Sequence, residues 1–322
     1  MRISMTGSKV QEMEPIVSPA RQGRLEAQVR RMRILVFLSI GSAALAGWVY
    51  LGAMVAAMVP VMDMADLGPG MQILNNFNVF HGLSAEARAA LAVLCLPAGL
   101  ETFGMPAASH WAAADFTLVF AMWMMMTLAM MLPSAAPMIS AYAETGVAAA
   151  PAEARLSPVF AVSLGYLSVW AGYALVATIF QWLLVEARLL SAMMAPATMV
   201  LAGTTMLAAG IYQFTPAKRA CLMRCQRPQE FFAMRFSDRI PRAYVLGIEQ
   251  GFLCFGCCWA LMTVMFAVGV MNIFWIAVLG AFMAIEKSIL SLWPSRLIGV
   301  LLLAWGAALI ATSPAGQALL AG

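Results

Sequence analysis

Apolar runs long enough to cross a lipid bilayer recur along the sequence, and they decide the class of fold. A hydrocarbon layer roughly 30 Å thick needs about 20 apolar residues per helix. Hydrophobic residues make up 63% of the 322 residues, and charged residues only 11%. We expect helices, because lipid offers backbone groups no partner and the two-residue alternation of barrel strands is absent. The sequence therefore predicts an all-α, polytopic integral membrane protein with about seven transmembrane helices. The expected spans are residues 34–59, 116–140, 159–183, 193–214, 247–270, 272–290 and 296–312.

Positive charge sets the expected orientation, because short cytoplasmic loops collect lysine and arginine. With a cytoplasmic amino terminus, only Arg88 and Arg188 of the 19 basic residues fall outside. This asymmetry predicts a multi-pass protein of the bacterial inner (cytoplasmic) membrane with its carboxyl terminus outside. Topology and anionic lipid headgroups account for the basic clusters, so we expect the lipid bilayer and no nucleic acid as a partner.

The spans divide the chain into membrane and non-membrane segments. A cytoplasmic basic tail covers residues 1–33, and the transmembrane helical domain covers residues 34–312. An external loop (60–115) and a cytoplasmic loop (215–243) interrupt that domain, and a short external tail (313–322) follows it. None of these segments is long enough to predict a separate domain.

Cysteine is concentrated in the fifth expected span. Cys254, Cys257 and Cys258 all lie there, out of six cysteines in the chain. At about 100° per residue, these thiols share one helix face with Gln250 and Met262. A rise of about 1.5 Å per residue from the start of the span places them near the middle of the membrane.

The second expected span adds thioether sulfur in the run WMMMTLAMMLP. Helical spacing divides its methionines into two arcs, either of which could face the cysteine helix. Methionine also fills irregular gaps in apolar cores, and packing alone would account for this run. The arcs are Met122, Met125, Met126 and Met130, and Met124, Met131 and Met138.

These sulfur ligands favour a particular metal. Thiolate and thioether ligands select Cu(I), whereas zinc prefers closed tetrahedral sets of cysteine and histidine. Neither helix contains histidine. Cu(I) with two thiolates and neutral methionines carries one net negative charge, which costs less desolvation than a divalent ion bound only by thiolates. We expect copper as Cu(I), bound by some of Cys254, Cys257, Cys258, Met262, Met126 and Met130.

Cys221 and Cys225 are four residues apart in the cytoplasmic loop. Thr215 can cap a short helix there, with Pro216 at its first position. Reducing cytoplasm keeps the two residues as thiols, and neighbouring basic side chains should lower their pKa values. We expect this pair to pass metal to or from the intramembrane site.

Several ionisable residues have open roles. His81 and His110 lie in the external loop, either as periplasmic metal collectors or as ordinary surface residues. Glu286 and Lys287 end the sixth expected span, where they are either site residues or an ion pair that anchors the helix.

Two glycines indicate how the fifth span packs. Gly247 and Gly251 form a small-xxx-small pair, which lets another helix approach closely. Glu249 faces away from the cysteines and should either snorkel or pair near the cytoplasmic boundary.

Three segments together resemble a known family: WMMMTLAMMLPSAAP (123–137), AGIYQFTPAKRACLMRCQRPQEF (209–231), and residues 247–287 around CFGCCWALM. The chain resembles a bacterial family of uncharacterised polytopic proteins described as predicted metal-binding integral membrane proteins, some of them labelled copper chaperones. The likeness covers residues 116–290 and leaves the basic tail, the external loop and the last helix outside. It implies a membrane fold and metal binding but no mechanism. The positions that match the motifs are Tyr212, Gln213, Pro216, Lys218, Cys221, Cys225, Gly256, Cys257, Cys258, Trp259, Met262 and Glu286.

Three functions follow from these patterns. The first is a non-enzymatic protein that transports Cu(I) or delivers it to a copper-dependent membrane or periplasmic protein. The second is a membrane thiol-disulfide redox relay that uses Cys254 and Cys257, whose spacing matches a redox pair. The third is an assembly or scaffolding subunit whose sulfur serves only packing. All three leave open an oligomeric form of the protein.

Overall fold

The computed structural model of the chain is mostly helical, and its described residues form no β-strand. Five helices are long and apolar enough to cross a membrane, which agrees with an all-α polytopic membrane protein. The structure describes residues 19–60, 63–78, 82–83, 87, 111–146, 156–190, 196 and 198–321. The five long helical segments are α1 (Pro19–Met58), α3 (Ala113–Thr145), α4 (Leu156–Glu186), α8 (Ile240–Thr263), which continues into α9 (Met265–Val268), and α11 (Trp293–Thr312).

Two of the seven expected spans are shorter helices. The expected span 193–214 is α5 (Met199–Tyr212), with 14 residues, and the expected span 272–290 is α10 (Ile273–Ser288), with 16. At about 1.5 Å per residue, each is shorter than a hydrocarbon layer roughly 30 Å thick. The seventh expected span, in contrast, is a full 20-residue helix. The structure thus has fewer full-length spans than the sequence predicts, because α5 extends only between the caps Thr198 and Gln213, and α10 only between the caps Asn272 and Ile289.

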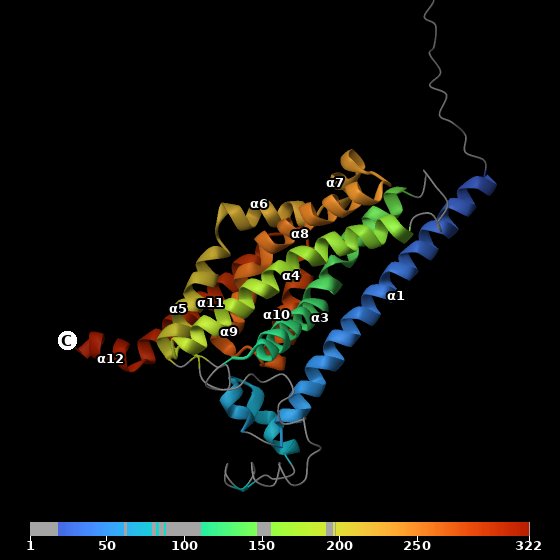
Figure 1. The fold of residues 1–322 in the computed structure, drawn as a ribbon. Coiled ribbons are helices and arrows are strands. Elements are labelled where there is room, and N and C mark those ends of the chain that lie inside the picture. The colour runs from blue at the N-terminus through green and yellow to red at the C-terminus, as the bar shows by residue number, and fades with distance from the viewer. Residues whose placement is uncertain are drawn as a thin grey trace, which may run out of the picture.

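The expected cytoplasmic loop folds into two short helices. Thr215 caps α6 (Pro216–Cys225) by accepting a hydrogen bond from the backbone N–H of Lys218 at 3.3 Å, which confirms the predicted helix start. A second helix, α7 (Pro228–Arg235), follows. α8 then begins at Ile240, several residues before the expected span. Figure 1 shows α6 and α7 turned across one end of the bundle.

The opposite end carries two 3₁₀ helices, η1 (Met64–Leu67) and η2 (Met71–Phe77) (Figure 1). They dock on the turn before α10, because Pro69 accepts hydrogen bonds from the Asn272 and Trp275 side chains at 3.0 and 3.1 Å. The last helix, α12 (Pro314–Ala321), follows α11 directly. The histidines and Cys95 of the external loop lie outside the described residues. Which end of the bundle faces the cytoplasm stays a prediction.

α8 packs closely against α4 through glycine. A Cβ atom at Gly247 would overlap the Val162 carbonyl, and one at Gly165 would overlap the Tyr244 carbonyl. A Cβ at Gly251 would lie 2.8 Å from the Val169 side chain. The predicted small-xxx-small contact is confirmed. This close approach holds the cysteine face of α8 at a fixed rotation against its neighbours.

Candidate metal centre

Three thiols on α8 form the centre of the site. The Sγ atoms of Cys254, Cys257 and Cys258 all lie within 4.8 Å of one another, and their residues are at most 2% exposed. The Cys257 and Cys258 sulfurs are 3.3 Å apart. The Cys257 thiol donates to the Cys254 carbonyl at 3.1 Å. The i, i+3, i+4 spacing brings them together, because these positions share one face of a helix.

A fourth thiol comes from the short helix α6. The Cys225 and Cys254 side chains line the same small cavity, so α6 and α8 meet at the cluster. Cys221 lies one turn earlier and packs over Gly256, where an added Cβ would approach its Sγ to 2.5 Å. The predicted pair is therefore divided: Cys225 joins the cluster, and Cys221 lies beside it.

The expected lowering of the two α6 thiol pKa values is wrong. Burial raises the pKa of Cys221, with only a smaller opposing effect from Arg224. Interaction with the Cys254 side chain, reinforced by burial, raises the pKa of Cys225 well above its ordinary value. Sequence proximity to basic residues misleads here, because Arg219 and Arg224 of α6 are exposed while the thiols are partly buried against the bundle.

Polar side chains from two other helices surround Cys254. The Lys287 ammonium of α10 donates to the Cys254 sulfur at 2.9 Å and to the Ser134 hydroxyl of α3 at 2.7 Å. The Tyr166 hydroxyl of α4 lies 2.9 Å from the same sulfur and donates to the Met131 carbonyl at 3.2 Å. The sequence marked Lys287 as an ionisable residue of open role, but nothing in it indicates Tyr166 or Ser134.

A small cavity of about 40 Å³ adjoins Cys254, which is room for one ion or one water molecule. The Gln250 side chain lines it and is 2% exposed, and its Nε2 atom has no hydrogen-bond partner among the described residues. The cavity is therefore polar on one side. Sulfur lines it too, from Cys225, Cys254 and Met138.

The two methionine arcs of α3 differ in position. Met138, on the second arc, lines the cavity. Met130 instead lies against Gly280 of α10, seven residues or about two turns from Lys287, and Met126 is a turn further along α3. No described contact brings Met126 or Met130 to the cysteines. Met262 of α8 is fully buried one turn beyond Cys258.

A buried ion pair fixes α6 to the bundle beside the site. The Lys218 ammonium lies 2.7 Å from the Glu286 carboxylate, and the two side chains are 1% and 0% exposed. Gln213 accepts a further hydrogen bond from Lys218, and Ser295 donates one to Glu286. Of the two open roles for Glu286, this is the anchoring one. Glu249, as predicted, pairs away from the cysteines, with Arg235 at 2.5 Å.

Comparison with known protein families shows which family the chain belongs to. Residues 120–309 match the PpoB2 family, described as copper chaperone. The chain belongs to the PpoB2 copper chaperone family. The match extends beyond residue 290, so the expectation that the last helix lies outside the likeness is wrong. No curated protein and no solved structure matches the chain.

The family description and the geometry of the cysteines both indicate metal binding. A copper chaperone family and a cluster of three buried cysteines fit a metal-binding role in a membrane protein. The donor set is suited to a soft ion, because every candidate ligand at the cluster is a thiol or a thioether.

Proposed function

We propose that this PpoB2 protein binds Cu(I) at Cys254, Cys257 and Cys258 in the bacterial inner membrane and transports or delivers it. The observation that carries the proposal is the convergence of three thiols within 4.8 Å on one helix. Metal–thiolate bonds are about 2.3 Å long at zinc, so two sulfurs on one ion lie up to about 4.6 Å apart. Small side-chain rotations would therefore bring these sulfurs onto a single ion.

The buried Lys287 ammonium would balance the negative charge of a metal–thiolate site. Cu(I) with two thiolates has a net charge of minus one, and the Lys287 ammonium beside Cys254 would neutralise it. Zn(II) with three thiolates would also be neutralised by Lys287, so charge balance leaves both ions open. The copper family description and the soft donors favour Cu(I).

The handover route would run through α6. Cys225 of α6 lines the cavity beside Cys254, and Cys221, which is half-buried, lies one turn earlier on the same helix. Ligand exchange between sulfurs in contact needs no long jump of the ion. Cu(I) would thus pass between a cytoplasmic donor or acceptor and the cluster by way of these two thiols.

The test is metal content under anaerobic, reducing conditions. Purified protein in detergent is offered equal Cu(I) and Zn(II), and bound metal is counted by mass spectrometry. We expect about one copper per chain, lost in the Cys257→Ser, Cys258→Ser variant. Cys221→Ser is the matched control and should keep the copper while exchanging it more slowly with an added chelator. Stoichiometric copper retained by the double variant would refute the site.

Cells that express the protein test the redox alternative. Lys287 beside Cys254 would also stabilise an attacking thiolate, which is what a thiol-disulfide relay requires. A reversible disulfide between Cys254 and Cys257 in cells, with no bound metal, would favour the relay. Full function of both serine variants would favour the scaffolding role.

A further inference from the structure

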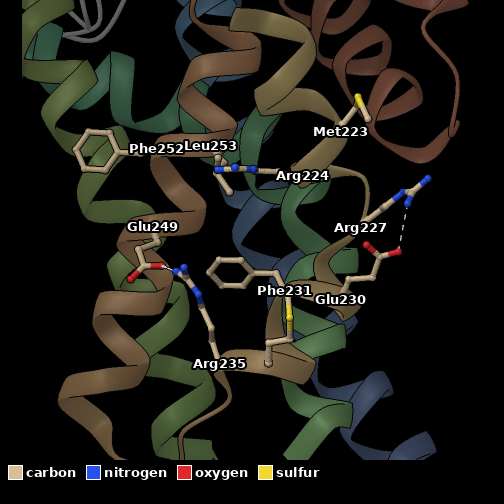
Figure 2. A pocket seen from close by; sticks show the side chains of 10 residues that line it. Met223, Arg224, Arg227, Glu230, Phe231, Arg235, Glu249, Phe252 and Leu253 are labelled. Carbon is tan, nitrogen blue, oxygen red and sulfur yellow. Dashed lines mark hydrogen bonds and ion pairs between the residues drawn. The ribbon is translucent and has the colours of Figure 1, made fainter.

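A groove separate from the cysteine cluster opens between α6, α7 and α8 (Figure 2). Its volume is about 660 Å³, within the range of roughly 300–1,000 Å³ that small-molecule sites occupy. Its walls carry three arginines, Arg224, Arg227 and Arg235, among aromatic and methionine side chains. Neither the metal site nor the handover route uses this groove.

The arginines of the groove outnumber their acidic partners. Arg235 is paired with Glu249 at 2.5 Å and lies over the Phe231 ring at 5.3 Å. Arg227 is paired with Glu230 at 3.4 Å. Among the described residues, no hydrogen bond or ion pair joins the Arg224 guanidinium to another side chain. Figure 2 shows its guanidinium directed toward α8. The groove therefore presents a cation that suits an anionic ligand.

The floor of the groove is apolar and belongs to a membrane-spanning helix. Phe252 of α8 is 60% exposed, within the helical segment Ile240–Val268 that is long and apolar enough to cross a membrane. Met234 of α7 is 82% exposed at the rim. An exposed phenylalanine on a spanning helix faces acyl chains, while the arginines lie on the expected cytoplasmic loop. Arginine and acyl-facing side chains meet at the level of the lipid phosphates.

From this juxtaposition we propose that the groove binds one anionic phospholipid, with its phosphate at Arg224 and Arg227 and an acyl chain along Phe252. A guanidinium fits phosphate oxygens through paired N–H donors. The apolar floor distinguishes this ligand from a free phosphate, which would leave Phe252 unused. The anionic headgroup distinguishes it from zwitterionic lipid, because the groove carries an unmatched positive charge.

Native mass spectrometry of the full chain in detergent tests this inference. The probes are phosphatidylglycerol and phosphatidylcholine with identical acyl chains. We expect retained phosphatidylglycerol in clear excess, and about fivefold weaker retention in Arg224→Gln, as one arginine near an anionic headgroup contributes. Arg219→Gln is the matched control, since Arg219 is an exposed arginine of the same helix outside the groove. It should retain the lipid as the unaltered chain does.

Three results would overturn the inference. Equal retention of both lipids would remove the role of headgroup charge. Equal losses of retained phosphatidylglycerol in Arg224→Gln and Arg219→Gln would show that general surface charge, and not a specific site, holds the lipid. Displacement of the lipid by millimolar inorganic phosphate alone would show an anion site without an acyl component. Bound copper, measured on the same samples, should not change, so this inference can fail while the metal site stands.

Discussion

The buried ion pair between Lys218 and Glu286 should be costly to break from one side. Its Nζ and Oε1 atoms are 2.7 Å apart, and both side chains are almost fully buried. At an effective dielectric constant of about 20, the attraction is about 6 kcal/mol. Desolvation of the two ions costs several kcal/mol each, so the intact pair adds little net stability. Removal of the carboxylate alone leaves a buried ammonium, and we expect Glu286→Gln to lower the free energy of unfolding by about 3–5 kcal/mol.

Loss of the Lys218–Glu286 ion pair should also affect the metal site, because this pair anchors α6, which carries Cys225. Gln213 would be the remaining hydrogen-bond partner of the ammonium, and α6 would open more often. Stability is measured by titration with sodium dodecyl sulfate in mixed micelles, followed by circular dichroism. Maleimide labelling of Cys225 in the same micelles reports how often α6 leaves the cluster. We expect labelling to accelerate in Glu286→Gln.

A second substitution supplies the control. Lys218→Met combined with Glu286→Gln leaves no lone buried charge, so the double variant should regain part of the lost stability. If the free energy of unfolding of Glu286→Gln lay within about 1 kcal/mol of that of the unaltered chain, the reasoning would be refuted, because an unpaired buried ammonium should cost more than that. Losses that simply add in the double variant would show that the two residues do not interact.

Two further predictions concern helix packing and thiol reactivity. Gly247→Ala should lower the free energy of unfolding by about 1–3 kcal/mol, because the new Cβ overlaps the Val162 carbonyl. Gly172→Ala on α4, where nothing lies within 4 Å, should change it little; an equal loss at both would contradict close packing as the cause. Alkylation of Cys221 by iodoacetamide should be slower than that of free cysteine at pH 8, since burial raises its pKa and leaves less thiolate. The rate should rise as pH approaches that raised pKa, and a rate above that of free cysteine at pH 8 would contradict the raised pKa.

The sequence alone determines the elements whose cause is local. Apolar runs of sufficient length predict helices in lipid, and five long helices are present. The i, i+3, i+4 spacing of Cys254, Cys257 and Cys258 predicts one face, because helical geometry is the same in any surroundings. The cap at Thr215 is local in the same sense. The spacing of Gly247 and Gly251 predicts that a helix packs closely there, but not that this helix is α4.

Only the tertiary structure decides what that cysteine face meets. Lys287 reaches Cys254 from 33 residues away, and Tyr166 reaches it from 88. Met138, and not Met126 or Met130, lies at the cavity. Helical periodicity gives the members of each face but not the rotation of one helix against another. In the absence of a hydrophobic drive between helices in lipid, close contacts such as those of the α4–α8 glycines set that rotation.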